Sequence, residues 1–490
     1  MNSKIKAFIG TICDNYIVLM LLILPLYTGG SYYLLGDTKY YLFFYLTVGF
    51  LLLWLGYRVI SFIGKATFAQ RQWSMVDIAV LSYGACAFLS ALASPYRGAA
   101  WTGYTEWYMG ALTQLLVVGI YFFVSEEYTG KNAYPIRAGE LGLALVVLIA
   151  FLQRFGVNVP GVHQPFAIQD WESSHMLSTI GNINWLCGYL SVMLPWPVVG
   201  MLCSTKRIPK LIYALLSVTA LTLTLTQGSD VGLLLVLTCL GLGAIYGMKQ
   251  PERFRRTMLL AAGVCVLCPV MGHIMICLGT EAMLAPDGFL SGLVTEPFWW
   301  VLAGLLLLVY LLQSTLPERV IVWLNRLLLL GGILLVLCFV IFYLSRIPKG
   351  EAWGSGRGGL WRAALHGFCE ADIYRKIIGF GPDCFAEYIY SSPTLAGYIQ
   401  MEGHWAASVF ANAHNEWLNM LINGGILGLF AYASVFVCAW KRYRGMMLGV
   451  MVLALYGINS LFSFQQVMST PLLFLTLGIC ESRCRKHADG

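Results

Sequence analysis

Apolar runs of membrane-spanning length alternate with short polar segments along almost the whole chain. A helix needs roughly 20 apolar residues to cross a bilayer, and 14 runs approach that length. We therefore predict an all-α polytopic membrane protein with 12 to 14 spans, because the fifth run and the last run are short. The runs cover residues 16–35, 40–60, 75–93, 109–124, 141–152, 185–202, 211–225, 231–246, 258–278, 298–312, 327–344, 418–437, 446–464 and 472–479.

One long polar stretch interrupts this pattern. Residues 346–416 are rich in charge and glycine, whereas most other connections between apolar runs are short. The chain shows no internal repeat and no low-complexity linker, so we expect residues 1–490 to form one membrane domain with this stretch inserted. Chemistry that needs polar side chains is expected in the inserted stretch.

Composition supports the membrane assignment. Of the 490 residues, 58% are hydrophobic and 11% are charged, and the mean hydropathy is +0.72. Soluble proteins have about a quarter charged residues, so the composition excludes an ordinary soluble protein. The net charge of +7 comes mostly from short loops between spans and implies no nucleic-acid partner.

Basic residues predict how the chain is oriented in the membrane. With both termini in the cytoplasm, 22 of the 31 basic residues fall on the cytoplasmic side, which basic residues near span ends prefer. The first span is expected to remain as an uncleaved anchor. The long polar stretch then faces outward, and its positive charge breaks the rule and suggests an anionic ligand there. Its basic residues are Arg346, Lys349, Arg357, Arg362, Arg375 and Lys376.

Two shorter outer segments also carry candidate groups. Residues 94–108 place Arg97 among aromatic side chains, and either an interfacial aromatic belt or a contact with a lipid-borne anion explains this. Residues 156–184 contain His163 and His175, but their spacing to nearby carboxylates fits no metal-ligand pattern. We expect no metal and no other cofactor.

Asp230 stands in a tight turn between two predicted spans at the outer face. The turn reads Gly-Ser-Asp, and the simplest explanation is a cap for the helix that starts near Val231. A carboxylate at the membrane edge is also available to a ligand.

Arg357 lies in a glycine-rich run, residues 354–365, just before a predicted amphipathic helix that contains Trp361. Its planar guanidinium matches phosphate geometry and keeps its charge at any ordinary pH. The neighbouring glycines allow backbone N–H groups to approach the same anion. In isolation, a solvated surface arginine is the simpler explanation.

His414, Asn415 and Glu416 stand where the long polar stretch enters the apolar run 418–437, so we place them in the first turn of a helix. A helix N-terminus has free N–H groups and a partial positive charge, which attract phosphate. The same charge is expected to lower the pKa of His414 and keep it neutral, able to accept a proton near pH 7. A helix cap by Asn412 with a polar interface is the alternative.

The order of these motifs resembles the O-antigen ligase and polymerase family. The shared pieces are a Gly-Arg-x-x-Leu-Trp run, a Gly-x-Gly turn followed by Phe, His-Asn-Glu at a helix start, and a Gly-Gly-x-x-Gly stretch. The matching residues are Arg357, Leu360, Trp361, Gly379, Gly381, Phe385, His414, Asn415, Glu416, Gly424, Gly425 and Gly428. The run 181–195, with Asn184 and Pro195, also looks like the family's asparagine-containing helix start. The strong motifs cover roughly residues 346–428.

The resemblance implies a glycosyltransferase of the bacterial plasma membrane with a GT-C-like helical architecture. Such enzymes move a glycan from undecaprenyl diphosphate to an acceptor hydroxyl at the outer face, with inversion and without a metal or nucleotide sugar. Arg357 would then hold the diphosphate, and His414 would act as general base or contact the leaving group. Glu416 would orient His414 or the acceptor, and Trp361 and Asn415 would contact substrate.

Asp230 departs from the family pattern, because a basic residue commonly follows the serine of this turn. Here Asp230 follows Ser229. Either Arg97 or Arg362 supplies the second cation for the diphosphate, or Asp230 itself contacts the sugar or the acceptor.

The acceptor stays open at this point. A second lipid-linked unit would make the protein a polysaccharide polymerase, a lipid or cell-wall anchor would make it a ligase, and a protein hydroxyl would make it an O-oligosaccharyltransferase. A transporter or flippase of lipid-linked glycans is the alternative from another class, but it predicts charges in the middle of spans, which are nearly absent. Peptidoglycan polymerases are a third possibility with a poorer motif match.

Overall fold

The computed structural model describes residues 3–29, 34–63, 71–157, 159, 174–248, 250–284, 294–346, 354, 356–399 and 408–488. Within these residues nearly all regular structure is helical, and one small antiparallel sheet pairs β1 (Met176–Leu177) with β2 (Gly181–Asn182). Nine described helical segments are long and apolar enough to cross a membrane. The predicted all-α class with several spans is therefore confirmed.

The first half of the chain forms helices around each predicted apolar run. They are α1 (Ser3–Val18), the π-helical turn η1 (Leu19–Ile23), α2 (Leu24–Leu26), α3 (Leu35–Ile63), α4 (Met75–Ala93), α5 (Arg97–Thr102), α6 (Ala111–Glu127), α7 (Tyr134–Arg154), α9 (Ile183–Met193), α10 (Pro195–Cys203), α11 (Arg207–Thr226) and α12 (Asp230–Gly247).

The second half contains the remaining apolar helices and four helices of the long polar stretch. The apolar helices are α13 (Pro251–Leu278), α14 (Phe298–Thr315), α15 (Glu318–Arg346), α20 (Glu416–Tyr443), α21 (Met447–Asn459) and α22 (Thr470–Ala488), with the 3₁₀ turn η2 (Glu281–Met283) after α13. The long polar stretch folds into α16 (Arg357–Glu370), α17 (Ile373–Ile378), α18 (Phe385–Tyr390) and α19 (Pro393–Ala396).

The first span begins well before the residue that the sequence pattern predicts. The apolar run 16–35 suggests a start near residue 16, whereas the helical segment that could span a membrane is Ile5–Leu26. Asp14 is the residue that makes the earlier part look unsuitable. It is buried, and Asn132 Nδ2 donates to its Oδ2 at 2.8 Å. A hydrogen-bonded carboxylate costs far less to bury than an unpaired one, so the helix continues through it.

The two shortest apolar runs belong to full-length helices. α7 continues to Arg154, whose buried guanidinium donates to the carbonyls of Ser174 at 3.1 Å and Gln227 at 2.9 Å. α22 continues past its apolar run because the buried Glu481 forms ion pairs with two arginines. The sequence pattern therefore ended these runs too early, because it counted charged residues as outside the helix although their buried partners allow the helix to continue.

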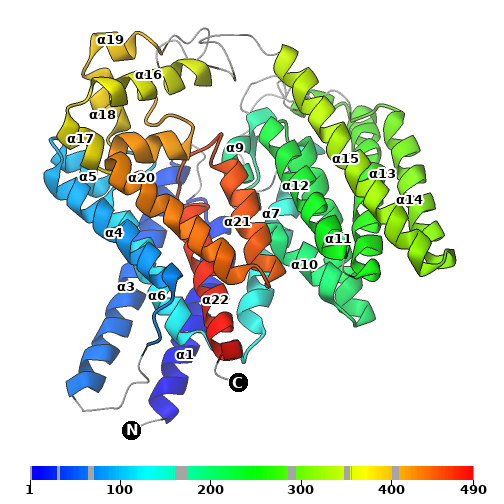
Figure 1. The fold of residues 1–490 in the computed structure, drawn as a ribbon, viewed down its shortest axis with the longest axis horizontal. Coiled ribbons are helices and arrows are strands. Elements are labelled where there is room, and N and C mark those ends of the chain that lie inside the picture. The colour runs from blue at the N-terminus through cyan, green and yellow to red at the C-terminus, as the bar shows by residue number, and fades with distance from the viewer. Residues whose placement is uncertain are drawn as a thin grey trace.

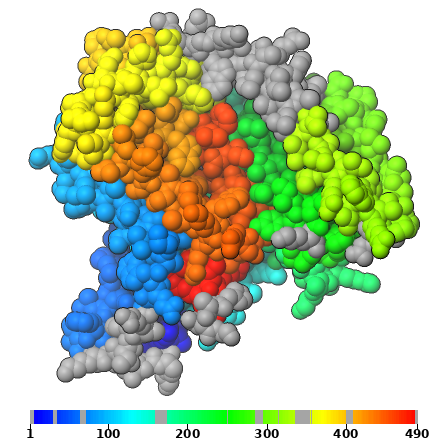
Figure 2. All heavy atoms as spheres, in the orientation of Figure 1, coloured from blue at the N-terminus to red at the C-terminus, as the bar shows by residue number. Residues whose placement is uncertain are grey.

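The α16–α19 region lies at the end of the molecule opposite both chain termini (Figure 1). Both N- and C-terminal ends of the described chain lie near the free end of α22. In the space-filling view, the yellow α16–α19 region covers the corner above α4 and α20 (Figure 2). α4 packs along α20, α6 packs along α22, and α16 and α17 pack against α20. The α16–α19 region and the ends of the described chain therefore lie at opposite ends of the molecule, and their sides of the membrane stay a prediction.

A break in α20 fixes the long polar stretch to the helix bundle. Gly425 has φ 63° and ψ −164°, which interrupts the helical hydrogen bonds and releases carbonyl groups. The N–H of Phe380 donates to the Ile422 carbonyl at 3.1 Å, and the N–H of Gly381 donates to the Asn423 carbonyl at 2.9 Å. The glycines of the Gly-x-Gly turn and of α20 thus allow the same contact, in which the turn packs against the break in α20.

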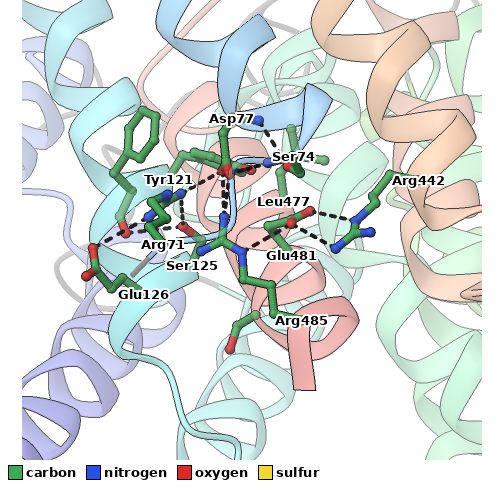
Figure 3. A network of polar contacts seen from close by, with 12 residues as sticks. Arg71, Ser74, Asp77, Tyr121, Ser125, Glu126, Arg442, Leu477, Glu481 and Arg485 are labelled. Atoms are coloured by element: carbon green, nitrogen blue, oxygen red, sulfur yellow. Dashed lines mark hydrogen bonds and ion pairs between the residues drawn. The ribbon is translucent and has the colours of Figure 1, made fainter. Parts of the chain in front are cut away.

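The end of the bundle near the termini is held by a network of buried ion pairs (Figure 3). Asp77 lies in the first turn of α4 and accepts hydrogen bonds from Arg71 and Arg485, each at 2.6 Å. Glu481 accepts from Arg442 at 3.2 Å and from Arg485 at 3.3 Å. Both carboxylates have no exposed side-chain area. Arg485 therefore joins α4 to α22, far from the α16–α19 region.

Candidate functional site

His414 sits at the start of α20, two residues before the helix begins. Its φ of 47° is a left-handed conformation that is uncommon for a side chain other than glycine. Asn412 Oδ1 accepts the His414 N–H at 3.0 Å and holds this turn. The sequence placed His414 in the first helical turn, and this is wrong, because the helix starts at Glu416.

Arg357 lies close enough to His414 for its charge to act on the imidazole. It is the first residue of α16, and the chain reaches it through Gly354 at φ 61° and Gly356 at φ 87°. One guanidinium nitrogen, Nη1, donates to the Gly354 carbonyl at 3.0 Å. Arg357 is thus near enough to His414 to influence its charge, while the site roles expected of both residues stay predictions.

The environment of His414 strongly favours the neutral imidazole. Burial, followed by the charge of Arg357, lowers the pKa of His414 to about 3. Part of the imidazole remains exposed, although aromatic rings cover it from two sides. The pKa of His414 is lowered, as expected, but the causes are burial and Arg357. With a pKa of about 3, the imidazole is a weaker base than anticipated.

Three aromatic side chains form a wall beside His414. The Phe464 ring lies edge-on to the imidazole with centroids 5.2 Å apart. Trp107 packs edge-on against Phe464 at 4.6 Å and against Trp185 at 5.1 Å. These residues come from three separate parts of the chain. Sequence analysis missed their common position, and the aromatic content of residues 94–108 was the only local signal.

Asp230 belongs to the same region as Arg357. Both residues act electrostatically on Cys187, which places them around one buried thiol of α9. The N-cap of α12 is Ser229, and its hydroxyl donates to Asn184 Oδ1 at 2.8 Å. Asp230 is therefore the first helical residue, where a negative charge interacts favourably with the helix dipole.

Asn415 and Glu416 have structural partners that direct them away from His414. Asn415 Oδ1 accepts the N–H groups of Trp417 at 3.1 Å and Leu418 at 3.0 Å, so Asn415 caps α20 in place of the anticipated Asn412. The Glu416 carboxylate accepts hydrogen bonds from Tyr432 and Tyr456 inside the bundle. Within the described residues, no hydrogen bond joins Glu416 to His414.

The other residues predicted for substrate binding lie at the edge of this region or away from it. Trp361 is half-buried on α16, with its ring 6.5 Å from that of Phe462. Arg362 is exposed on the same helix and lies over the Tyr398 ring at 5.1 Å. Arg97 is exposed at the start of α5, and no described contact joins it to Arg357 or His414.

Some of the basic side chains predicted at the outer face donate hydrogen bonds to backbone carbonyls. The buried Lys39 Nζ donates to the carbonyls of Leu24, Pro25 and Tyr27, each at 2.8 Å. Arg375 Nη1 donates to the carbonyls of Ala93 at 2.9 Å and Gly379 at 3.2 Å. Together with Arg154, these residues account for three basic side chains of the predicted outer face without a ligand, but of the three only Arg375 belongs to the long polar stretch.

Asp383 fixes the outer aromatic segment to the Gly-x-Gly turn. Its Oδ2 accepts the backbone N–H groups of Tyr104 at 2.8 Å and Met109 at 3.0 Å. Burial raises the pKa of Asp383 to about 7, against the opposing effect of these two hydrogen bonds. The sequence analysis missed this residue, although an Asp directly after Gly-Pro is typical of a structured turn.

His163 lies outside the described residues, so its predicted lack of a metal role stays a prediction. His175 is buried, and its Nδ1 shares a hydrogen bond with the Ser174 hydroxyl at 2.7 Å. In the part of the chain that the structure describes, no three His, Cys, Asp or Glu residues come together as metal ligands would.

A comparison with protein-family models and with curated proteins finds no match for this chain.

Proposed function

We propose that this protein is a membrane glycosyltransferase that moves a glycan from a polyprenyl diphosphate, expected to be undecaprenyl diphosphate, to an acceptor hydroxyl at the outer face. The proposal rests above all on one observation, the approach of Arg357 to His414 at the start of a broken membrane helix. The motif order resembling O-antigen ligases and polymerases, together with the GT-C-like architecture that it implies, supports the proposal.

Arg357 is suited to bind the diphosphate. A guanidinium forms charge-assisted, often bidentate hydrogen bonds to phosphate oxygens. Arg357 also begins a helix of 14 residues, whose first N–H groups favour an anion at the same place. As the glycosidic bond to the donor breaks, negative charge grows on the diphosphate. A fixed cation there stabilises the transition state more than the ground state.

His414 is suited to handle the proton of the acceptor hydroxyl. In the reaction, the hydroxyl oxygen attacks the anomeric carbon, the bond to the diphosphate oxygen breaks, and the hydroxyl proton must leave. The neutral imidazole can accept a hydrogen bond from this hydroxyl and take up its proton as the new bond forms. A bound diphosphate offsets the charge of Arg357 and therefore raises the pKa of His414. Donor binding would in this way make His414 a better base.

The aromatic wall offers a surface for sugar rings. The apolar C–H face of a sugar packs on an aromatic ring, and Phe464, Trp107 and Trp185 lie beside His414. Asp230 and Ser229 place further polar groups in the region of Arg357. We assign Asp230 to the sugar or acceptor side, because a carboxylate next to the diphosphate would repel it. We favour the polymerase reaction among the possible acceptors.

A transporter of lipid-linked glycans is the second candidate, and the break in α20 is the observation that favours it. Discontinuous helices at a cavity are common in transporters. Transport routes have ionisable groups within spans. Against a transporter, the buried Lys39 and Arg154 lie at helix ends and hold backbone carbonyls. The buried Asp14 does lie inside the first span, but Asn132 donates a hydrogen bond to it. We therefore place the enzyme first.

The test compares cells that carry wild-type protein with cells that carry Arg357→Ala or His414→Ala at equal membrane abundance. A polymerase predicts loss of long surface glycan and accumulation of lipid-linked single units in both variants. A ligase predicts long lipid-linked chains that are not transferred. Unchanged surface glycan and unchanged lipid-linked intermediates in both variants would reject the glycosyltransferase proposal.

A further inference from the structure

A cavity with several polar groups in a largely apolar wall lies next to His414, between α4, α6 and the broken part of α20. It is lined by Tyr83, Cys86, Ala87, Met109, Gln114, Pro382, Asp383, Asn412, Glu416, Asn419, Met420, Asn423, Gly424, Gly428, Phe464 and Gln465. Two of these residues contact His414 directly. Asn412 accepts its N–H, and the Phe464 ring packs against its imidazole.

The residues of the cavity wall suit a neutral ligand that carries hydroxyl groups. The described wall contains two carboxyl groups, those of Asp383 and Glu416, and no Lys, Arg or His, so the cavity does not suit a phosphate. Side-chain amides of Asn and Gln both donate and accept hydrogen bonds, as hydroxyl groups do. The walls also include the aromatic rings of Tyr83 and Phe464. The cavity thus contrasts in charge with the region around Arg357.

One buried group in the cavity has an unused hydrogen-bonding position. Asn423 is 6% exposed, and its Oδ1 has no hydrogen-bond partner within the described structure. A buried, unpaired amide oxygen is costly and is rare in folded proteins. Two neighbouring amides of the wall are bonded to each other, since Gln114 Nε2 donates to Gln465 Oε1 at 2.7 Å. Asn423 Oδ1 is therefore the acceptor that a ligand hydroxyl would meet.

The size of the cavity limits the ligand. Its volume of about 40 Å³ accommodates about three waters, since one water needs roughly 10–15 Å³ on this scale. That space fits the hydroxyl-bearing edge of one sugar ring, whose hydroxyls would replace ordered waters. A full oligosaccharide would extend past Phe464 toward His414.

We infer that this cavity binds the acceptor sugar of the transfer reaction, with Asn423 Oδ1 accepting a hydrogen bond from one of its hydroxyls. The inference rests on the proposed function and adds a separate subsite to it. The diphosphate lies at Arg357, the reacting hydroxyl at His414, and another hydroxyl-bearing edge of the acceptor ring in the cavity beside Phe464. Asn423 then determines acceptor affinity and has no part in holding the diphosphate.

Two substitutions test the cavity without removing a structural contact. Asn423→Leu replaces the amide by two methyl groups with the same branching and so removes the unpaired oxygen, and it leaves the backbone carbonyl that holds the Gly-x-Gly turn. Gly428→Leu fills the cavity, because Gly428 is buried and an added Cβ meets only the Met420 carbonyl at 3.8 Å. The matched control is Gly49→Leu on the exposed face of α3, where an added Cβ meets nothing within 4 Å.

The experiment measures the thermal stability of the purified full chain in detergent with two kinds of probe. One probe is a panel of methyl glycosides of common hexoses and N-acetylhexosamines, and the other is inorganic diphosphate. We expect at least one glycoside to stabilise wild type, Gly49→Leu and Arg357→Ala. We expect the same glycoside to have no effect on Gly428→Leu and to need about three- to tenfold higher concentration with Asn423→Leu. Diphosphate should stabilise both cavity variants and fail with Arg357→Ala.

The outcomes separate the cavity from the proposed function. If no glycoside stabilises wild type, or if one stabilises Gly428→Leu as well as wild type, the cavity holds water only and the inference is wrong. If diphosphate fails to stabilise wild type, the proposed diphosphate site at Arg357 is wrong, and the inference about the cavity is not affected. In the transfer assay, Asn423→Leu should raise the KM for acceptor and leave the KM for donor unchanged. A rise only in the donor KM would assign the cavity to the donor glycan and overturn the inference.

Discussion

The guanidinium of Arg357 acts on the imidazole of His414 and helps to keep it neutral, although the whole α16–α19 region separates the two residues in the chain. A permanent cation beside a neutral histidine is a useful pair for breaking a bond to a diphosphate. The cation meets the charge that develops on the leaving group, and the histidine meets the proton of the attacking hydroxyl. Four predictions follow from this pair and from the contacts that hold it in place.

Replacing Arg357 by lysine should lower kcat for glycan transfer by about 10²- to 10³-fold, the usual effect of losing a fixed donor to developing charge. Lysine keeps the charge but loses the planar fork. The matched control is Arg362→Lys on the same helix, where the side chain is exposed over Tyr398. Equal losses in the two variants, measured with a lipid-linked donor, would contradict a specific role for Arg357.

The pH dependence of transfer should differ between free protein and donor complex. In the free protein the pKa of His414 is about 3, so kcat/KM should show no loss from His414 protonation down to about pH 4. A bound diphosphate offsets Arg357 and raises the pKa of His414, so the acidic limb of kcat should lie at a higher pH. Coincident acidic limbs for kcat and kcat/KM would argue against this coupling.

Asp383 should make the protein less stable as the pH rises toward 7. Its pKa of about 7 in the folded protein exceeds the ordinary value of 3.8, so the folded state holds the proton more tightly than the unfolded state. Stability from this group is fully present below pH 4 and is lost as the pH rises through 7. The loss is on the order of 2–4 kcal/mol. Thermal unfolding of Asp383→Asn in detergent should show a flatter pH profile over this range, and an unchanged slope would count against the assignment.

Gly425→Ala should destabilise the protein by at least about 2 kcal/mol and abolish transfer. Gly425 has φ 63°, and an added Cβ would lie 2.5 Å from the Ile377 carbonyl. The substitution would therefore detach the Gly-x-Gly turn from α20 and move the His414 region. The neighbouring Gly424→Ala is the control, because its added Cβ meets nothing within 4 Å. Similar unfolding temperatures for the two variants would show that the break is not required.

The sequence predicted the membrane helices better than the way they meet. The apolar run 75–93 coincides with α4 because Ser74 and Asp77 form a capping box that marks its start locally. The start of the first span was wrong because the partner of Asp14, Asn132, lies far along the chain. A hydrophobicity pattern carries no information about such partners.

The candidate site was predictable only in part for the same reason. The motif order singled out Arg357 and His414, and the structure brings them together. Glu416 belongs to the same motif, yet its carboxylate points to Tyr432 inside the bundle, a direction that spacing alone does not indicate. Phe464 and Asp383 were missed, because their roles depend on contacts between distant segments.

The central claim is tested most directly by supplying the purified protein, in lipid vesicles, with an acceptor and a radiolabelled glycan on undecaprenyl diphosphate. The account predicts that label moves to the acceptor with release of undecaprenyl diphosphate, and that Arg357→Ala and His414→Ala each abolish this transfer while Arg362→Ala does not. Movement of the intact lipid-linked glycan across the vesicle membrane, with no new glycosidic bond, would contradict the account and favour a transporter.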